Sequence, residues 1–135
     1  MTKSLKVTIT VYGAIGFLFG LAYLLFPRQA IAIQSSEGNP SAYLVGTKMV
    51  LGASIFAAGI FLMFAARDPI KHILWVKFAI TFAVLFLAVA LYSGFYLFAD
   101  VRQALVGILI HGVATVALLA FYPWGTLRSG EYAPS

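Results

Sequence analysis

The sequence contains no cysteine. Disulfide bonds, thiolate nucleophiles, iron–sulfur clusters and cysteine-bound zinc are therefore excluded. Charge is also scarce, because charged residues make up 10% of the 135 residues and hydrophobic residues 62%. An ordinary soluble domain has about a quarter charged residues. So few charges could not cover a water-soluble domain of this length, and we predict that lipid surrounds most of the chain.

Four long apolar stretches are present, at residues 7–26, 43–66, 72–98 and 103–122. The 20 residues of the first stretch include no charge, and as an α-helix they would extend about 30 Å, the thickness of a hydrocarbon core. The last two connections are short and polar, so the helices that they join must be antiparallel neighbours. We predict an all-α fold: one membrane-spanning antiparallel four-helix bundle over residues 1–135, with a mobile tail at 125–135.

The beginning of the chain has a second interpretation, because a basic start followed by an apolar run resembles a signal peptide. The apolar part of a signal peptide has about 7–15 residues, and this run has 20, so we predict that it stays as the first spanning helix. In the connection that follows, residues 35–40 are typical of a turn, and residues 28–33 are compatible with a short interfacial helix.

Lysine and arginine indicate the orientation, because they are enriched on the cytoplasmic side of membrane proteins. Six fall on the side of the two termini and three on the opposite side. We therefore predict a multi-pass protein of the cell's inner (plasma) membrane with both termini cytoplasmic. The six are Lys3, Lys6, Arg67, Lys71, Lys77 and Arg128, and the three are Arg28, Lys48 and Arg102.

Small residues mark the faces on which membrane helices pack, because they let two backbones approach closely. The second helix has small residues on two sides, which predicts packing against two protein neighbours; one side holds Gly46, Thr47, Ser54, Ala57 and Ala58. The predicted packing glycines are Gly16, Gly20, Gly52, Gly59 and Gly107.

The fourth helix has two distinct faces when residues are placed at 100° intervals. We predict that one face lies inside the bundle; it holds Ala104, Gly107, His111, Ala114, Thr115 and Leu118. We predict that the other faces lipid; it holds Leu105, Val106, Leu109, Val113, Val116 and Ala120.

His111 is the most informative polar residue, because it falls near the middle of the fourth helix, about 16 Å from its inner end. An ionisable group at that depth is costly and normally faces the bundle or a cavity. It could accept a proton or bind a ligand, such as a quinone carbonyl or a lipid headgroup oxygen. Alternatively it is a neutral histidine bonded to a helix hydroxyl or a backbone carbonyl.

Lys77, Tyr12 and Thr115 could join His111 in a polar ligand-binding pocket that opens toward the cytoplasmic side. Lys77 and Tyr12 would lie about 8 Å from that side, and Thr115 about 10 Å. Lys77 shares its face with Thr81, which favours an inward direction. The alternative is that the Lys77 stem reaches back to the headgroups.

The scarce carboxylates allow one ion pair and disfavour several functions. We predict a Lys48–Asp100 pair at the outer interface, which would contribute about 0–1 kcal/mol. No Asp or Glu lies within a hydrocarbon span, which disfavours a proton-coupled exporter. His72 and His111 lie at different depths, which disfavours a bis-histidine haem. No catalytic, metal or nucleic-acid motif is present, so we predict no catalytic residue, no metal and no nucleic-acid partner.

The layout resembles the small bacterial DoxX-like four-helix membrane proteins. The first helix carries glycines through residues 13–20 and ends in Phe26-Pro27. The second has glycines at Gly46, Gly52 and Gly59 and closes on residues 65–69. The resemblance implies an accessory membrane subunit, in some cases one associated with quinone-linked redox systems, and it transfers no site residue.

We therefore hold three hypotheses about function. The first is an accessory or assembly subunit that binds a partner membrane protein or lipid. The second is a redox component that binds a quinone-like or lipid-like small molecule, with quinone as the one conceivable cofactor. The third is a small oligomeric transporter. The expected partners are membrane lipids and either a membrane protein or further copies of the chain.

Overall fold

The structure, a computed structural model, describes residues 2–34, 39–97 and 101–124. All regular elements in these segments are helical. In chain order they are α1 (Thr2–Leu25), α2 (Pro27–Gln34), α3 (Ala42–Ala65), α4 (Ile73–Tyr92), the π-helical turn η1 (Ser93–Leu97) and α5 (Val101–Phe121).

The predicted fold class is confirmed. Four helices are long and apolar enough to cross a membrane: α1, α3, α4 continued by η1, and α5. The first begins at Thr2, five residues earlier than the apolar stretch, because the polar start contains no helix breaker. Leu25 ends α1, and Pro27 begins α2 in the first helical position, where its missing N–H costs no bond. The predicted tail at 125–135 lies outside the described residues.

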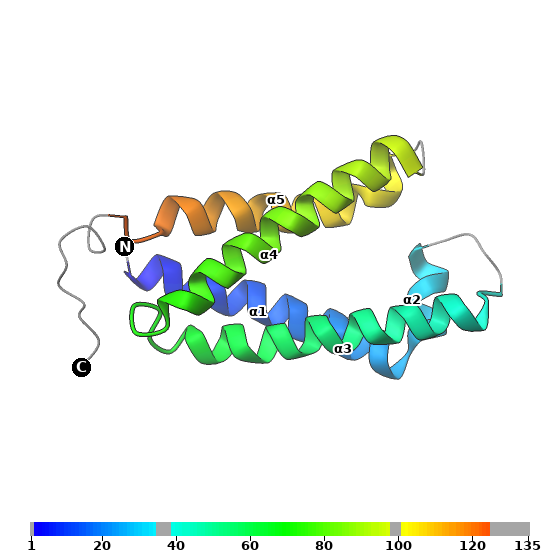
Figure 1. Cartoon of the computed structure of the whole chain (residues 1–135), viewed down its shortest axis with the longest axis horizontal. Coiled ribbons are helices and arrows are strands. Elements are labelled where there is room, and N and C mark those ends of the chain that lie inside the picture. Colours follow the sequence, from blue (N-terminus) through cyan, green and yellow to red (C-terminus); the bar gives the residue numbers. More distant parts are fainter. Residues whose placement is uncertain (1, 35–38, 98–100, 125–135) are drawn as a thin grey trace.

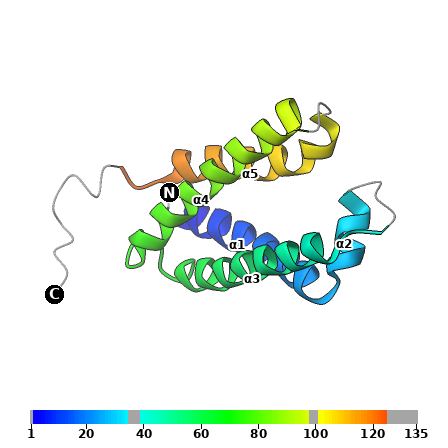
Figure 2. The same cartoon turned by 45° about the vertical axis from the view of Figure 1, so that its right-hand side comes forward.

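The four long helices form two hairpins. α1 packs most extensively against α3, and α4 packs against α5, whereas the contacts that join the hairpins, α1 with α5 and α3 with α4, are smaller. We call α1–α3 the first hairpin and α4–α5 the second hairpin. Figures 1 and 2 show that they lie together at the end that holds the N-terminus and diverge toward the other end, here called the far end.

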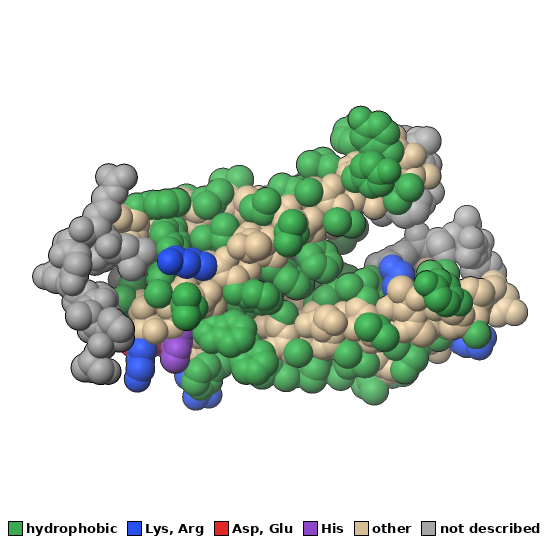
Figure 3. Space-filling model, in the orientation of Figure 1, with side chains coloured by type: hydrophobic (Ala, Val, Ile, Leu, Met, Phe, Trp, Pro, Cys, Tyr) green, Lys and Arg blue, Asp and Glu red, His purple; other side chains and the backbone are tan. Residues whose placement is uncertain are grey.

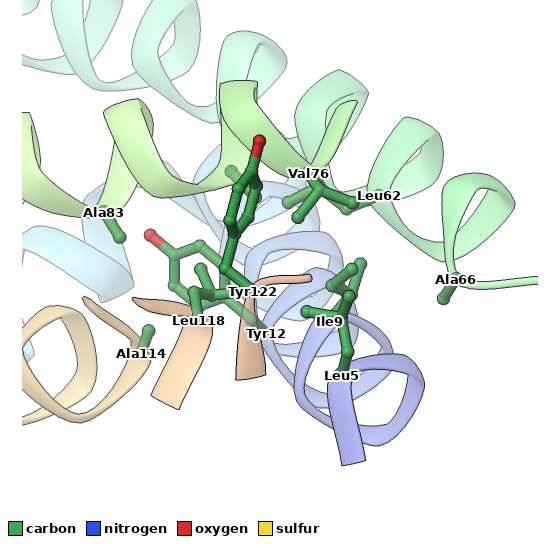
Figure 4. Close-up of a cluster of buried hydrophobic side chains, with 11 residues drawn as sticks. Leu5, Ile9, Tyr12, Leu62, Ala66, Val76, Ala83, Ala114, Leu118 and Tyr122 are labelled. Carbon is green, nitrogen blue, oxygen red and sulfur yellow. The ribbon is translucent and has the colours of Figure 1, made fainter. Parts of the chain in front are cut away.

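The shared hydrophobic core lies at the N-terminal end of the bundle. All four long helices contribute to it, and its largest fully buried side chains are at most 1% exposed: Leu5, Ile9, Val76 and Leu118. Figure 4 shows these side chains together with Tyr12, Ala83 and Ala114, which are the members of the core that lie nearest the far end.

Beyond this level, burial occurs within each hairpin rather than between hairpins. In the first hairpin Gly20, Tyr23 and Gly52 are buried against one another, and in the second Gly94 and Ala104 are buried. Figure 3 shows the space-filling surface open between the two hairpins at the far end. We call this opening, between the far halves of the two hairpins and beyond Tyr12, the notch.

Glycines set the close approach of α1 and α3. A Cβ added to Gly20 would lie 2.4 Å from the Phe56 backbone nitrogen, and one added to Gly59 would lie 2.5 Å from the Phe17 nitrogen. A Cβ on Gly52 would lie 2.6 Å from the Tyr23 Cβ. These distances are shorter than any van der Waals contact, so only glycine fits there without a shift of the helices.

The other predicted packing glycines have ordinary contacts. A Cβ on Gly16 would be 3.6 Å from its nearest neighbour, and one on Gly107 would be 3.4 Å from the Ala90 Cβ. Gly13 lies on the same face of α1 as Gly20, and its added Cβ would be 3.1 Å from the Gly59 carbonyl oxygen. The glycines with the tightest contacts, Gly13 and Gly20 on α1 and Gly52 and Gly59 on α3, are two turns apart on each helix.

The burial of α5 agrees with the two predicted faces. Every residue of the predicted inward face is buried or partly buried, and every residue of the predicted lipid face is exposed. In α3 one small-residue face packs on α1, whereas the other predicted face is exposed except for Ala58, which is buried, so its second protein neighbour stays a prediction. The exposed small residues are Gly46, Thr47, Ser54 and Ala57.

Candidate functional site

Tyr12 and His111 form a hydrogen-bonded pair that joins the two hairpins. The Tyr12 hydroxyl lies 2.8 Å from Nδ1 of His111. Tyr12 comes from α1 and His111 from α5, so two residues that are far apart in the sequence meet at the boundary between core and notch. The sequence analysis grouped both in one pocket, and the structure brings these two together.

The pair lies at mid-depth in the bundle. His111 is ten residues from each end of α5, about 15 Å along the axis. Tyr12 is ten residues from the start of α1, also about 15 Å along the helix axis, whereas its predicted depth of about 8 Å is counted from the membrane surface and stays a prediction.

Aromatic rings hold the imidazole on two sides. The Tyr12 ring meets it edge-on, with centroids 5.8 Å apart at 89°, and the Phe86 ring of α4 lies 5.1 Å away at 40°. Phe86 is itself stacked on Phe82 at 4.4 Å. The imidazole therefore lies between α1 and α4, in the plane where the two hairpins separate.

The surroundings of Tyr12 assign the histidine tautomer. Tyr12 is 6% exposed, and Nδ1 of His111 is the only acceptor for its hydroxyl among the residues that the structure describes. A buried hydroxyl that donates to nothing is costly, so we assign the phenol as donor and Nδ1 as acceptor. In the neutral imidazole the proton then sits on Nε2.

Thr115 and Lys77, the two other predicted pocket residues, do not reach the imidazole. The Thr115 hydroxyl donates to the backbone carbonyl of His111 at 2.7 Å, so it bonds within its own helix. Lys77 lies on an exposed face of α4, together with Thr81 and Ala88. Its position agrees with the alternative in which the side chain reaches back to the headgroups.

Lys48 lies in the far half of α3, where its ammonium nitrogen is 5.3 Å from the centre of the Tyr23 ring. A cation over an aromatic face is attracted by the ring electrons. The predicted partner Asp100 lies outside the described residues, so the ion pair stays a prediction.

Phe86 is the residue of this site that the sequence reasoning did not identify. It ends a row of aromatic side chains on one face of α4, in which neighbouring centroids are 5.7, 5.6 and 4.4 Å apart: Trp75, Phe78, Phe82 and Phe86. Their spacing of three and four residues is visible in the sequence and could have indicated this face.

The arrangement is suited to binding and contains no evident catalytic set. Within the described part of the chain, no three His, Asp or Glu side chains gather as metal ligands would. Comparisons with models of known protein families, with curated proteins and with solved structures found no match. The resemblance to DoxX-like proteins stays a prediction from the sequence pattern.

Proposed function

We propose that this chain is a non-catalytic membrane component that binds a lipophilic small molecule, lipid-like or quinone-like, in the notch between its two hairpins. One observation carries the proposal: a polar hydrogen-bonded pair, Tyr12 and His111, joins the two hairpins at mid-length, and the surface is open between the apolar hairpins farther along (Figure 3). Pockets for small ligands are typically apolar with a few placed polar groups.

The construction of the bundle supports this interpretation. The core at the N-terminal end holds the hairpins together, and the glycine contacts make the first hairpin a close-packed unit. The far halves are then separated by space that lipid chains or a ligand would fill. With the termini cytoplasmic, as the distribution of Lys and Arg favours, the notch opens toward the outer leaflet.

A matched pair of substitutions on α5 tests the proposal. Gly107 lies one turn from His111 toward the far end on the inward face, where an added Cβ would lie 3.4 Å from the Ala90 Cβ of α4, and Val106 lies on the outward face, 59% exposed. We expect Gly107→Trp to reduce the lipophilic molecules that co-purify in mild detergent, measured by mass spectrometry of the extract. Val106→Trp adds the same ring to the lipid side and should change nothing.

Two outcomes contradict the proposal. The first is that the purified wild-type protein retains no small molecule beyond the lipids of an unrelated membrane protein. The second is that both tryptophan variants, folded by circular dichroism, retain the same molecules in the same amounts as the wild type.

An accessory role is the second candidate, and the exposed face of α3 favours it. This face carries a shallow groove, and a Cβ added to Gly46 would meet no atom within 4 Å. The Thr47 and Ser54 hydroxyls donate to carbonyls of their own helix at 2.9 and 3.0 Å, so their hydrogen atoms are already bonded. A helix of a partner could therefore approach this face closely. The groove is lined by Ala42, Tyr43, Gly46, Thr47, Val50, Leu51 and Ser54.

The absence of cysteine makes this candidate easy to test, because an engineered thiol is unique in the chain. We expect Ser54→Cys on the α3 face to cross-link to a membrane protein or to a second copy in native membranes. Val106→Cys on the lipid side of α5 is the control. Equal cross-linking from both positions would remove this candidate.

A further inference from the structure

The second ring nitrogen of His111 is reachable from outside the protein. Nδ1 is occupied by the Tyr12 hydroxyl, and the tautomer assigned above puts the remaining proton on Nε2. Among the described residues, Nε2 has no hydrogen-bond partner, although every fully sealed side-chain nitrogen or oxygen there has one. Nε2 is therefore not sealed, which agrees with the partial exposure of His111.

The depth of this N–H restricts what can satisfy it. It lies about 15 Å from both ends of α5, near the middle of the hydrocarbon layer. Lipid tails carry no acceptor, and an N–H without an acceptor is costly in that medium. The oxygens of a phospholipid lie at the headgroup level, so a phospholipid in its normal position cannot reach Nε2.

The ring is also held in a defined orientation. Phe86 lies on one side of the imidazole and Tyr12 on another, and the Tyr12 hydrogen bond fixes the rotation of the ring. Because the ring cannot rotate, its N–H points in one direction. The site therefore favours a ligand with a hydrogen-bond acceptor at one position over apolar molecules in general.

On the basis of the proposed function, we infer that Nε2–H of His111 donates a hydrogen bond to the oxygen of a neutral lipophilic carbonyl compound, whose polar group lies at bilayer mid-depth in the notch. The ligand is neutral, because a carboxylate at that depth would be strongly disfavoured. Its carbonyl oxygen supplies the acceptor that neither the protein nor the lipid tails provide, and its apolar part lies between the hairpins.

Two probes separate the hydrogen bond from apolar binding. A decyl-substituted 1,4-benzoquinone carries carbonyl oxygens, and decylbenzene has the same chain and a ring without oxygen. Binding of each to the full-length protein in detergent is measured by native mass spectrometry. For the quinone, a ¹³C-labelled carbonyl also reports the hydrogen bond as a lower infrared stretching frequency.

His111→Phe removes the N–H and keeps an aromatic ring of similar size. We expect it to weaken quinone binding about fivefold to tenfold, which corresponds to one hydrogen bond. It should abolish the infrared shift and leave decylbenzene binding unchanged, which also shows that the variant is folded. His111→Gln returns an N–H donor and should recover part of the affinity and of the shift.

The inference is overturned if His111→Phe binds the quinone as tightly as the wild type, or if the quinone carbonyl shows no shift in the wild type. If Gly107→Trp then excludes both probes, the notch still binds lipophilic molecules and only the role of His111 is lost. If the wild type binds neither probe, the inference and the proposed function both fall.

Discussion

Replacing Gly20 with alanine adds one methyl group at the closest approach of α1 and α3. The new Cβ would lie 2.4 Å from the Phe56 nitrogen, 2.6 Å from its Cα and 2.7 Å from its Cβ. A Cβ is fixed by the backbone and cannot rotate away. Because carbon atoms pack at about 3.5–4.0 Å, the two helices must separate locally by about 1 Å.

The expected cost follows from two opposing terms. Overpacking of a close contact costs about 1–3 kcal/mol. Alanine is a better helix former than glycine by about 1 kcal/mol, which offsets part of the loss. We therefore expect Gly20→Ala to lower the free energy of unfolding by about 0–2 kcal/mol, which is about 1–3 kcal/mol worse than an alanine substitution at a helix position with free space. Gly46→Ala, with no atom within 4 Å of the new Cβ, should be neutral or slightly stabilising.

Reversible unfolding by SDS in mixed micelles, followed by circular dichroism, measures the difference. Gly16→Ala serves as an intermediate case on the same helix as Gly20, because its Cβ would be 3.6 Å from the nearest atom. The reasoning is refuted if Gly20→Ala is as stable as Gly46→Ala, since both exchanges have the same chemistry and differ only in the space around the methyl group.

Three further predictions use the same measurement. Leu118→Ala leaves a cavity in the shared core, where the Leu118 side chain is 0% exposed, and should lower the free energy of unfolding by about 2–5 kcal/mol. Leu109→Ala, at a side chain that is 56% exposed on the lipid side, should lower it far less. Equal losses of stability would contradict the assignment of the two faces of α5. Tyr12→Phe removes the bond to His111 and should cost about 1 kcal/mol, so a variant as stable as the wild type would show that the bond does not hold the hairpins together. Thr115→Val breaks only a bond within α5 and should stay within about 0.5 kcal/mol of the wild type; a loss above about 1 kcal/mol would place its hydroxyl in a contact between helices.

The spanning helices were predictable, because the hydrocarbon layer fixes both their length and their composition. The inward face of α5 was also predictable, because small and polar residues on one side and branched apolar residues on the other leave one arrangement. His111 could be placed on that face from the helical period alone. Tyr12 could be assigned to the same pocket as His111. The contact between the two side chains could not be demonstrated, since it depends on the relative depth of α1 and α5.

The remaining features depend on information that the sequence pattern does not carry. The start of α1 at Thr2 was missed, because Lys3 and Lys6 mark the end of the apolar run and not the end of the helix. Which glycines of α1 and α3 make the tightest contacts was not predictable, because the relative position of the two helices decides which glycines meet. The separation of the hairpins was not predictable either, since an apolar side chain is equally well placed against lipid or against another helix.

The pairing of helices has a consequence for biosynthesis. The first hairpin ends at Ala65, before α4 begins at Ile73, so its glycine-lined contact can form in the nascent chain before the second hairpin leaves the ribosome. Before the second hairpin docks, Leu5 and Ile9 face acyl chains instead of α4 and α5. That interval is inexpensive, because lipid is as apolar as the missing helices. Insertion can therefore proceed in two steps, with the second hairpin docking onto an already formed first.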